Sequence, residues 1–440
     1  MNNKRKKIVY ALLLVSALFS LFSFSAFANE LIDAVRLNDK TKVNAILASG
    51  FSVDSRDSNN KTALMWALEN DFDDISKLLI ESGADVNTRY SYGMSILMSS
   101  INRGRVQMAK YLIGKGADVN AQFNNEMTAL FLAIERNQQD LARLLLEKKA
   151  DTDFKGKNGA TALVLAFRNG DKEIIKLINK SGHKPANYIE ALIMNDTAAL
   201  KNFLSEKSSV DSNDKDISKA IKFAIDEGYS EPAQLVIAKL DNVNLRDSAD
   251  YTLLMLACSQ GNIAIAKMLI DKGADLKARG TNGITALIIS ASKGYLNLAI
   301  LLVQKGAELD AMDNNGTSAL MMAVINGHAD VAKFLMNSGA RVNEKGKNSF
   351  RVLNIAINFG YNDLAVLLIK KGARVNARDN NGQTPIILAA SKGYADVVQL
   401  LIKKGARVNS KDNFGQTALI VASRKNYKEI SEMLKTAGAK

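Results

Sequence analysis

Residues 379–409 read DNNGQTPIILAASKGYADVVQLLIKKGARVN. Thr384 is a good helix N-cap and Pro385 suits the first position of a helix, so a short helix is predicted to begin here. Gly393 ends that helix, because glycine accepts the left-handed conformation that closes a helix. The apolar residues that follow supply the stripe of a second helix, which Gly405 ends. The stretch therefore predicts two short helices joined by a glycine turn.

This pattern recurs along the chain. The closing glycine of the quoted stretch belongs to a series whose members fall on a 33-residue spacing, at Gly50, Gly83, Gly116, Gly182, Gly273, Gly306, Gly339, Gly372, Gly405 and Gly438. Self-similarity at a fixed period of this length indicates a solenoid, in which each unit buries its apolar face against its neighbours. A hydrophobic content of 47% with only 6% aromatic residues fits small, closely packed helices. We expect one elongated array of helices.

The segments between units end in Asn-Gly pairs, at residues 158–159, 282–283, 315–316 and 381–382. Such pairs favour tight turns, so each segment is predicted to project as a hairpin finger.

The repeat resembles the ankyrin repeat from Glu30 to Lys440. The shared features are a mid-repeat glycine, a closing Leu-Leu-Ile-x-x-Gly-Ala-x-Val-Asn, and a helix opening of the Thr-Pro-Leu type, seen at Thr62-Ala63-Leu64, Thr128-Ala129-Leu130, Thr161-Ala162-Leu163, Thr285-Ala286-Leu287, Thr384-Pro385-Ile386 and Thr417-Ala418-Leu419. The resemblance implies an all-α ankyrin-repeat solenoid of stacked helix-turn-helix units with β-hairpin fingers, about 13 units long. It also implies binding to a partner protein on the concave face.

The spacing fails once. The closing position after Gly182 falls at Lys207, only 25 residues further, and residues 183–185 replace the usual finger. We expect a helix over residues 186–194, and an N-terminal arm of about five units (29–182), a degenerate joint with a shortened finger (183–245) and a C-terminal arm of about six units (246–440). Two interpretations of the joint stay open, a hinge between arms and sequence drift within a continuous array.

The first 28 residues have the pattern of a secretory signal peptide. A basic stretch at 4–7 precedes an apolar run at 8–22, and Ala26-Phe27-Ala28 forms a small-x-small cleavage site. The sequence thus predicts an exported protein of the bacterial envelope or secreted type, in the periplasm or outside the cell. The alternative is an inner-membrane anchor formed by uncleaved residues 8–28.

Catalytic signatures are missing from the sequence. It has two histidines and one cysteine, and it lacks the common metal-, phosphate- and dinucleotide-binding motifs. We expect His328 and Cys258 to pack within the array, Trp66 to lie in the core or at its rim, and His183 to be placed in the joint where it could contact a ligand. The prediction is a protein that is not an enzyme and carries no cofactor and no metal.

The expected concave face carries cations before the mid-repeat turn and aromatic residues on the fingers. The candidate partner-binding residues are Tyr92, Arg103, Arg136, Arg168, Tyr251, Lys293, Phe350, Phe359, Lys392, Phe414, Arg424 and Lys425. Cations and aromatic anchors in this arrangement suit an acidic protein surface. The alternative is a face that only keeps the protein soluble.

The partner is expected to be a protein and the chain a monomer with no stable membrane span after signal cleavage. The formal net charge is +13, but acidic residues recur in every unit and no nucleic-acid recognition motif is present, so nucleic acid is not expected. The resemblance leaves two other roles open: an envelope accessory protein that assists a haem enzyme such as catalase, and a secreted host-directed effector.

Overall fold

The computed structural model describes residues 30–124, 127–156, 159–214, 216–247, 249–344, 346 and 351–440. The chain divides into two compact units that meet in the sequence between Ala186 and Asn187. The predicted signal peptide, residues 1–28, lies outside the described residues. Within the described part of the chain, no helix is both long and apolar enough to cross a membrane.

The first unit is a row of helix pairs. After a helical segment at residues 30–36, it contains α2 (Lys40–Ala48), α3 (Ala63–Glu69), α4 (Asp73–Glu81), α5 (Ile96–Asn102), α6 (Val106–Gly114), β1 (Gln122–Phe123), β2 (Met127–Thr128), α7 (Ala129–Glu135), α8 (Gln139–Glu147), α9 (Ala162–Asn169) and α10 (Lys172–Lys180).

The second unit continues the same alternation. It contains α11 (Tyr188–Ile193), α12 (Thr197–Ser205), α13 (Ile217–Asp226), α14 (Ser230–Lys239), α15 (Leu253–Ser259), α16 (Ile263–Asp271), η1 (Thr281–Gly283), α17 (Ala286–Lys293), α18 (Leu296–Gln304), α19 (Ala319–Ile325), α20 (Ala329–Asn337), α21 (Val352–Phe359), α22 (Asn362–Lys370), α23 (Pro385–Lys392), α24 (Ala395–Lys403), α25 (Ala418–Arg424) and α26 (Lys428–Thr436). The predicted all-α repeat solenoid with helix-turn-helix units is confirmed.

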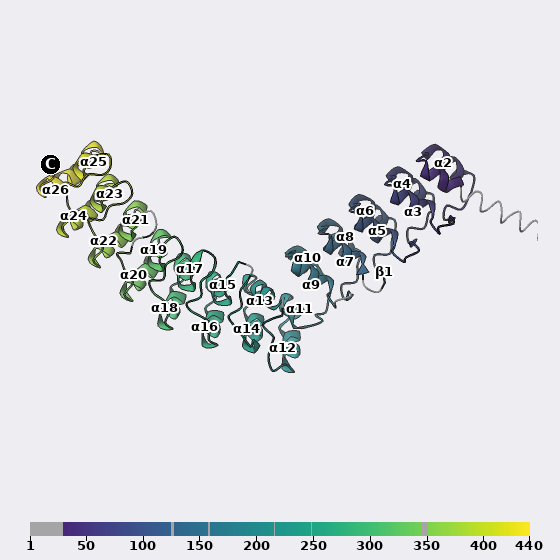
Figure 1. Cartoon of the computed structure of the whole chain (residues 1–440), viewed down its shortest axis with the longest axis horizontal. Coiled ribbons are helices and arrows are strands. Elements are labelled where there is room, and N and C mark those ends of the chain that lie inside the picture. Colours follow the sequence, from purple (N-terminus) through teal and green to yellow (C-terminus); the bar gives the residue numbers. More distant parts are fainter. Residues whose placement is uncertain are drawn as a thin grey trace, which may run out of the picture. The chain divides into compact units, whose positions relative to one another are not determined.

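Each repeat consists of a first and a second helix that pack antiparallel around a mid-repeat turn. Within each unit, first helices pack on the first helices of neighbouring repeats, as in α5 on α7 and α17 on α19 (Figure 1). Leu64, Met98 and Leu112 are among the large side chains that this stacking buries completely. Because successive layers bury one another, the core is a strip that runs along each unit.

The mid-repeat turns form the clearest series in the described chain. A residue with positive φ occupies each of thirteen turns, at Asn38, Asp71, Gly104, Asn137, Gly170, Asn195, Gly228, Gly261, Gly294, Gly327, Gly360, Gly393 and Asn426. Every interval is 33 residues except the 25 between Gly170 and Asn195. Asparagine and aspartate tolerate this conformation, so the series continues where glycine is missing.

Side-chain caps fix where the first helices begin. A hydroxyl at the N-cap accepts the third helical backbone N–H at Thr62, Ser95, Thr128, Thr161, Thr252, Thr285, Ser318 and Thr417. Thr384 holds the same position, as predicted, but its hydroxyl makes no cap bond. The helix predicted over residues 186–194 begins later, at Tyr188, because the Asn187 side chain accepts from the backbone of Glu190 and fixes the start there.

The fingers are short hairpins. Strands β1 and β2 pair antiparallel, with Gln122 opposite Thr128. Single antiparallel bridges close four other fingers, at Arg56 and Thr62, Arg89 and Ser95, Arg246 and Thr252, and Met312 and Ser318.

Candidate functional site

The candidate site starts from the residues at the end of each first helix, just before the mid-repeat turn. We call these the ladder residues. In the first unit, the Nη2 atom of Arg103 lies 3.2 Å from Asp71 Oδ1, and Arg136 Nη2 donates to Asn102 Oδ1 at 2.6 Å. Arg168 is exposed in the last turn of α9. Two of these cations therefore also tie one repeat to the repeat before it.

The second unit carries four cations at or beside the ladder position. Lys425 Nζ donates to the carbonyl of Ser391 at 2.7 Å, and Arg424 donates to Gln416 at 3.1 Å. Lys293 and Lys392 are exposed at the ends of α17 and α23, and the ammonium group of neither makes an ion pair or hydrogen bond with any residue that the structure describes. Their ammonium groups are therefore exposed and have no counter-charge among the described residues.

Phe359 occupies the ladder position of α21. Its side chain is 58% exposed, and its ring stacks on Tyr361 with the centroids 6.0 Å apart. In repeat order it follows Lys293 and directly precedes Lys392. The second unit thus presents an exposed aromatic ring in the same series as two unpaired cations.

The predicted finger aromatics differ in exposure. Tyr92 is 55% exposed and stacks on Tyr90, while Phe414 is 76% exposed. Tyr251 is half-buried. Phe350 lies outside the described residues. The candidate residues are divided between the two units, with Tyr92, Arg103, Arg136 and Arg168 in the first and the others in the second.

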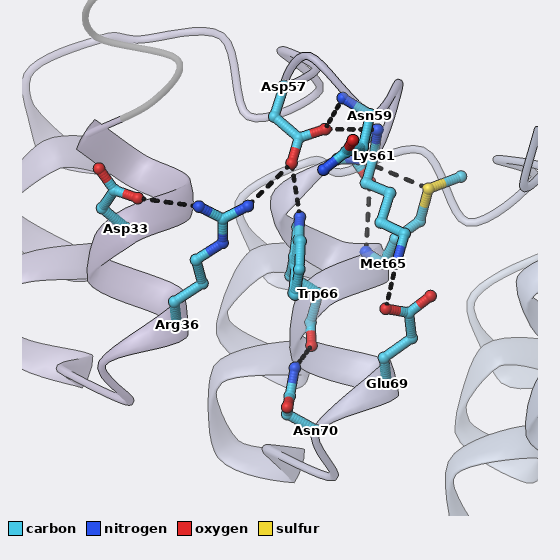
Figure 2. Close-up of polar contacts among 10 residues, drawn as sticks. Asp33, Arg36, Asp57, Asn59, Lys61, Met65, Trp66, Glu69 and Asn70 are labelled. Carbon is cyan, nitrogen blue, oxygen red and sulfur yellow. Dashed lines mark hydrogen bonds and ion pairs between the residues drawn. The ribbon is translucent and has the colours of Figure 1, made fainter.

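Figure 2 shows a cluster of polar side chains around Trp66, which was not predicted from the sequence. At its centre, the carboxylate of Asp57 accepts from the indole Nε1 of Trp66 at 2.9 Å and from Arg36 at 3.2 Å. The same carboxylate accepts the backbone N–H groups of Asn59 and Lys61. Burial raises the pKa of this carboxyl, but these hydrogen bonds and the nearby guanidinium outweigh burial and hold the pKa below its ordinary value.

Both faces of the Trp66 indole meet a cation. The Arg36 guanidinium carbon lies 4.2 Å from the ring centroid and Lys61 Nζ lies 4.6 Å from it. Lys61 in turn pairs with Glu69 at 2.7 Å. Because its N–H group and both faces of its ring contact neighbouring residues, Trp66 joins the first helical segment to the second repeat. This agrees with the expected position in the core or at its rim.

Arginines of the fingers form a second feature that sequence reasoning missed. Arg89 donates to the carbonyl of Gln122 at 2.7 Å, Arg246 to that of Arg279 at 2.8 Å, and Arg279 to that of Met312 at 2.7 Å. Each bond joins residues 33 apart, so each arginine holds the next finger. The signal in the sequence was the spacing of the arginines, which is 33 residues between Arg56 and Arg89 and again between Arg246 and Arg279.

The residues considered for chemistry pack inside the repeats. His328 Nε2 lies 3.0 Å from the carbonyl of Ser292, and Cys258 is fully buried, which raises the pKa of its thiol to about 12. The His183 side chain is 1% exposed and its Nδ1 lies 2.6 Å from Asp153. The expectation that His183 could contact a ligand is therefore wrong, because the side chain is buried. Among the described residues, no group of three or more His, Cys, Asp or Glu side chains is placed to hold a metal ion.

A family model described as "Ankyrin repeats (3 copies)" matches residues 31–123, 117–187, 189–280, 276–346 and 353–440. No curated protein matches the chain.

Proposed function

The chain belongs to the ankyrin-repeat family, whose members generally mediate protein–protein interaction, and we propose that it is a non-enzymatic scaffold that binds a partner protein with an acidic surface through its ladder residues. The binding follows from complementarity of shape and charge. No bond is made or broken.

The observation that carries this proposal is the exposed ring of Phe359 in series with the ammonium groups of Lys293 and Lys392, which have no partner in the described part of the chain. Exposed aromatic rings become anchors when a partner buries them, and they supply much of the affinity of an interface. Charges around such an anchor steer the encounter and select partners of opposite charge. A partner that offers an apolar pocket flanked by carboxylates would match this series.

Charge reversal tests the proposal. We expect the double variant Lys293→Glu/Lys392→Glu to bind the native partner about tenfold or more weakly, because both charges would now face carboxylates. Lys267→Glu/Lys333→Glu is the matched control, since these two lysines are also exposed but lie on the second helices α16 and α20. Arg103 and Arg136 are less suitable, because they also tie repeats together.

The readout is affinity purification from the native cell, with mass spectrometry to identify the partner and titration to compare the variants. Equal affinity for wild type and the Lys293→Glu/Lys392→Glu variant would overturn the ladder as the binding face.

We further propose that the chain is exported, to the periplasm or outside the cell. The support is the pattern of residues 1–28, a basic stretch followed by an apolar run and a small-x-small site. Mass spectrometry of the mature N-terminus tests it. A protein beginning near Asn29 is expected, whereas an intact N-terminus in the membrane fraction would favour the anchor formed by residues 8–28.

A further inference from the structure

One position of the repeat changes its charge along the chain. It is the residue after the closing Gly-Ala or Lys-Ala pair, and it is acidic in five repeats, at Asp85, Asp118, Asp151, Asp275 and Glu308. It is arginine in the next three repeats, at Arg341, Arg374 and Arg407.

The backbone at this position has the same structural role whichever side chain it carries. The N–H of Asp118 donates to Asn87 Oδ1 at 2.7 Å, in the preceding repeat. The N–H groups of Arg374 and Arg407 donate in the same way, to the asparagine side chain 31 residues earlier, at 2.8 Å. The stacking of repeats therefore does not require arginine here.

The aspartates make a further bond that an arginine cannot make. Asp85 Oδ1 accepts the backbone N–H of Asn87 at 2.8 Å, and Asp118 Oδ1 accepts that of Asn120 at 2.9 Å. A guanidinium has no acceptor, so each arginine gives up this local cap. The change to arginine removes a hydrogen bond that stabilises the turn. We therefore look for a function of these arginines other than folding.

Two of these arginines line one hollow. The hollow has a volume of about 650 Å³, and its lining includes five cations, Arg351, Lys370, Arg374, Lys404 and Arg407, and no carboxylate. Lys370 and Lys404 follow the ordinary preference for cations at helix C-termini, so the arginines carry the argument.

The charge in this hollow is not neutralised from within. Arg374 and Arg407 make no ion pair with any residue in the described part of the chain, and Arg351 donates to the backbone carbonyl of Asn343. The contrast is Arg341, which lies outside the hollow and pairs with Asp310 and Glu344. Cations gathered in a hollow without a counter-charge concentrate anions there.

We propose that this hollow binds a multiply phosphorylated ligand. Guanidinium groups hold phosphate oxygens through paired, charge-assisted hydrogen bonds, and phosphate supplies more negative charge for its volume than carboxylate does. The volume suits a small ligand or a headgroup.

The hollow is separate from the ladder. Its lining residues lie at and after the C-terminal ends of α22 and α24, whereas the ladder residues end the first helices at the mid-repeat turn. Because the two helices of a repeat run antiparallel, these are opposite ends of each helix pair. The proposed phosphate site and the proposed partner-binding face can therefore be tested independently of each other.

The test uses the full chain and tripolyphosphate, titrated by calorimetry at physiological salt. One molecule should bind, and Arg374→Asp or Arg407→Asp should each weaken binding about tenfold or more. Both variants place aspartate where other repeats have it, so they should remain folded, with thermal unfolding at or above the wild-type temperature. The matched control is Arg341→Asp, which makes the same charge change outside the hollow and should bind within about twofold of wild type, because Arg341 does not line the hollow and its charge is already paired with Asp310 and Glu344.

A second arm distinguishes the source of the phosphate. Wild type and the variants are sedimented with phosphatidylcholine vesicles, with and without cardiolipin, whose headgroup carries two phosphates. Binding to the cardiolipin vesicles that is lost in Arg374→Asp identifies a lipid headgroup, and binding to tripolyphosphate alone identifies a soluble ligand. The proposal is overturned if neither probe binds, if Arg374→Asp and Arg407→Asp bind as wild type does, or if Arg341→Asp weakens binding as much as they do.

Discussion

The ring of Tyr295 covers Gly261. A Cβ atom added to Gly261 would lie 2.9 Å from Tyr295 Cζ, closer than real Cβ contacts come. Gly261 is the mid-repeat turn of one repeat, and Tyr295 follows the mid-repeat turn of the next. The same relation recurs at Gly294 and His328, Gly327 and Tyr361, Gly360 and Tyr394, and Gly393 and Tyr427. Each ring thus packs on the bare backbone of the preceding turn, which makes these turns part of the interface between repeats.

Replacing Gly261 by alanine should therefore destabilise the protein more than the turn conformation alone explains. Gly228 is the control, because it is a mid-repeat turn of the same unit with a similar φ, +77° against +72°, and open space where a Cβ would go. We expect Gly228→Ala to cost about 1 kcal/mol and Gly261→Ala about 1 kcal/mol more. Denaturant unfolding measures both, and equal losses would contradict the packing role of Tyr295.

Asp57→Asn should destabilise the first unit. An asparagine can still accept from Asn59 and Lys61, but its NH₂ group would face the donors of Trp66 and Arg36. The expected loss is about 1–3 kcal/mol near neutral pH. Trp66 is the one tryptophan of the chain, so its fluorescence reports unfolding of this cluster. Asp74→Asn, at a side chain that is 79% exposed, should change stability by less than about 0.5 kcal/mol.

The loss in Asp57→Asn should depend on pH. The pKa of Asp57 in the folded protein lies below its ordinary value of 3.8. A depressed pKa gives stability that is present above the ordinary value and disappears as pH falls through the folded value. The difference between wild type and variant should therefore shrink in acid. A difference that stays constant from neutral pH into this range would contradict the carboxylate's role.

Asn354→Met should stabilise the second unit. The Asn354 side chain is buried in α21, and neither its oxygen nor its nitrogen has a hydrogen-bond partner among the residues that the structure describes. The equivalent position of the preceding repeat is Met321. Removing a buried amide without partners should raise the free energy of unfolding by about 1–3 kcal/mol. Thermal unfolding measures this, and a lower midpoint would show that the amide is satisfied in solution.

A chain that ends at Ala186 should remain soluble and helical, and so should residues 187–440. The boundary between the two compact units falls there, and in a repeat array the stability is held mainly between neighbouring repeats. Circular dichroism and gel filtration of the two fragments provide the measurement. Aggregation of either fragment would favour a continuous array and count against a hinge in the joint.

The repeat could be predicted from the sequence because its signals are local. Gly393 ends α23 in the left-handed conformation, and the interval of 25 residues before Asn195 matches the predicted break. Contacts between repeats were harder to predict, because each contact depends on the directions of side chains in two neighbouring repeats. The bonds of Arg89 and Arg279 and the covering of Gly261 by Tyr295 belong to this class.

The candidate site was predictable only in part, for the same reason. The 33-residue period predicts which residues occupy the ladder positions. It does not predict which of their side chains are free of bonds to neighbouring repeats. Arg103 and Arg136 are bonded to neighbouring repeats, while Lys293 and Lys392 are unpaired among the described residues. Likewise, Arg374 and Arg407 can be found in the sequence, but only the structure shows that they line one hollow together with Arg351.

Site-specific photo-crosslinking determines whether a partner protein lies against the ladder residues. A photoreactive benzoylphenylalanine replaces Phe359 in one variant and Lys333, on the second helix α20, in the other, and both are irradiated in the native cell. We predict that the partner is crosslinked from position 359 and not from position 333. Crosslinking of the partner from position 333 but not from position 359 would contradict the account.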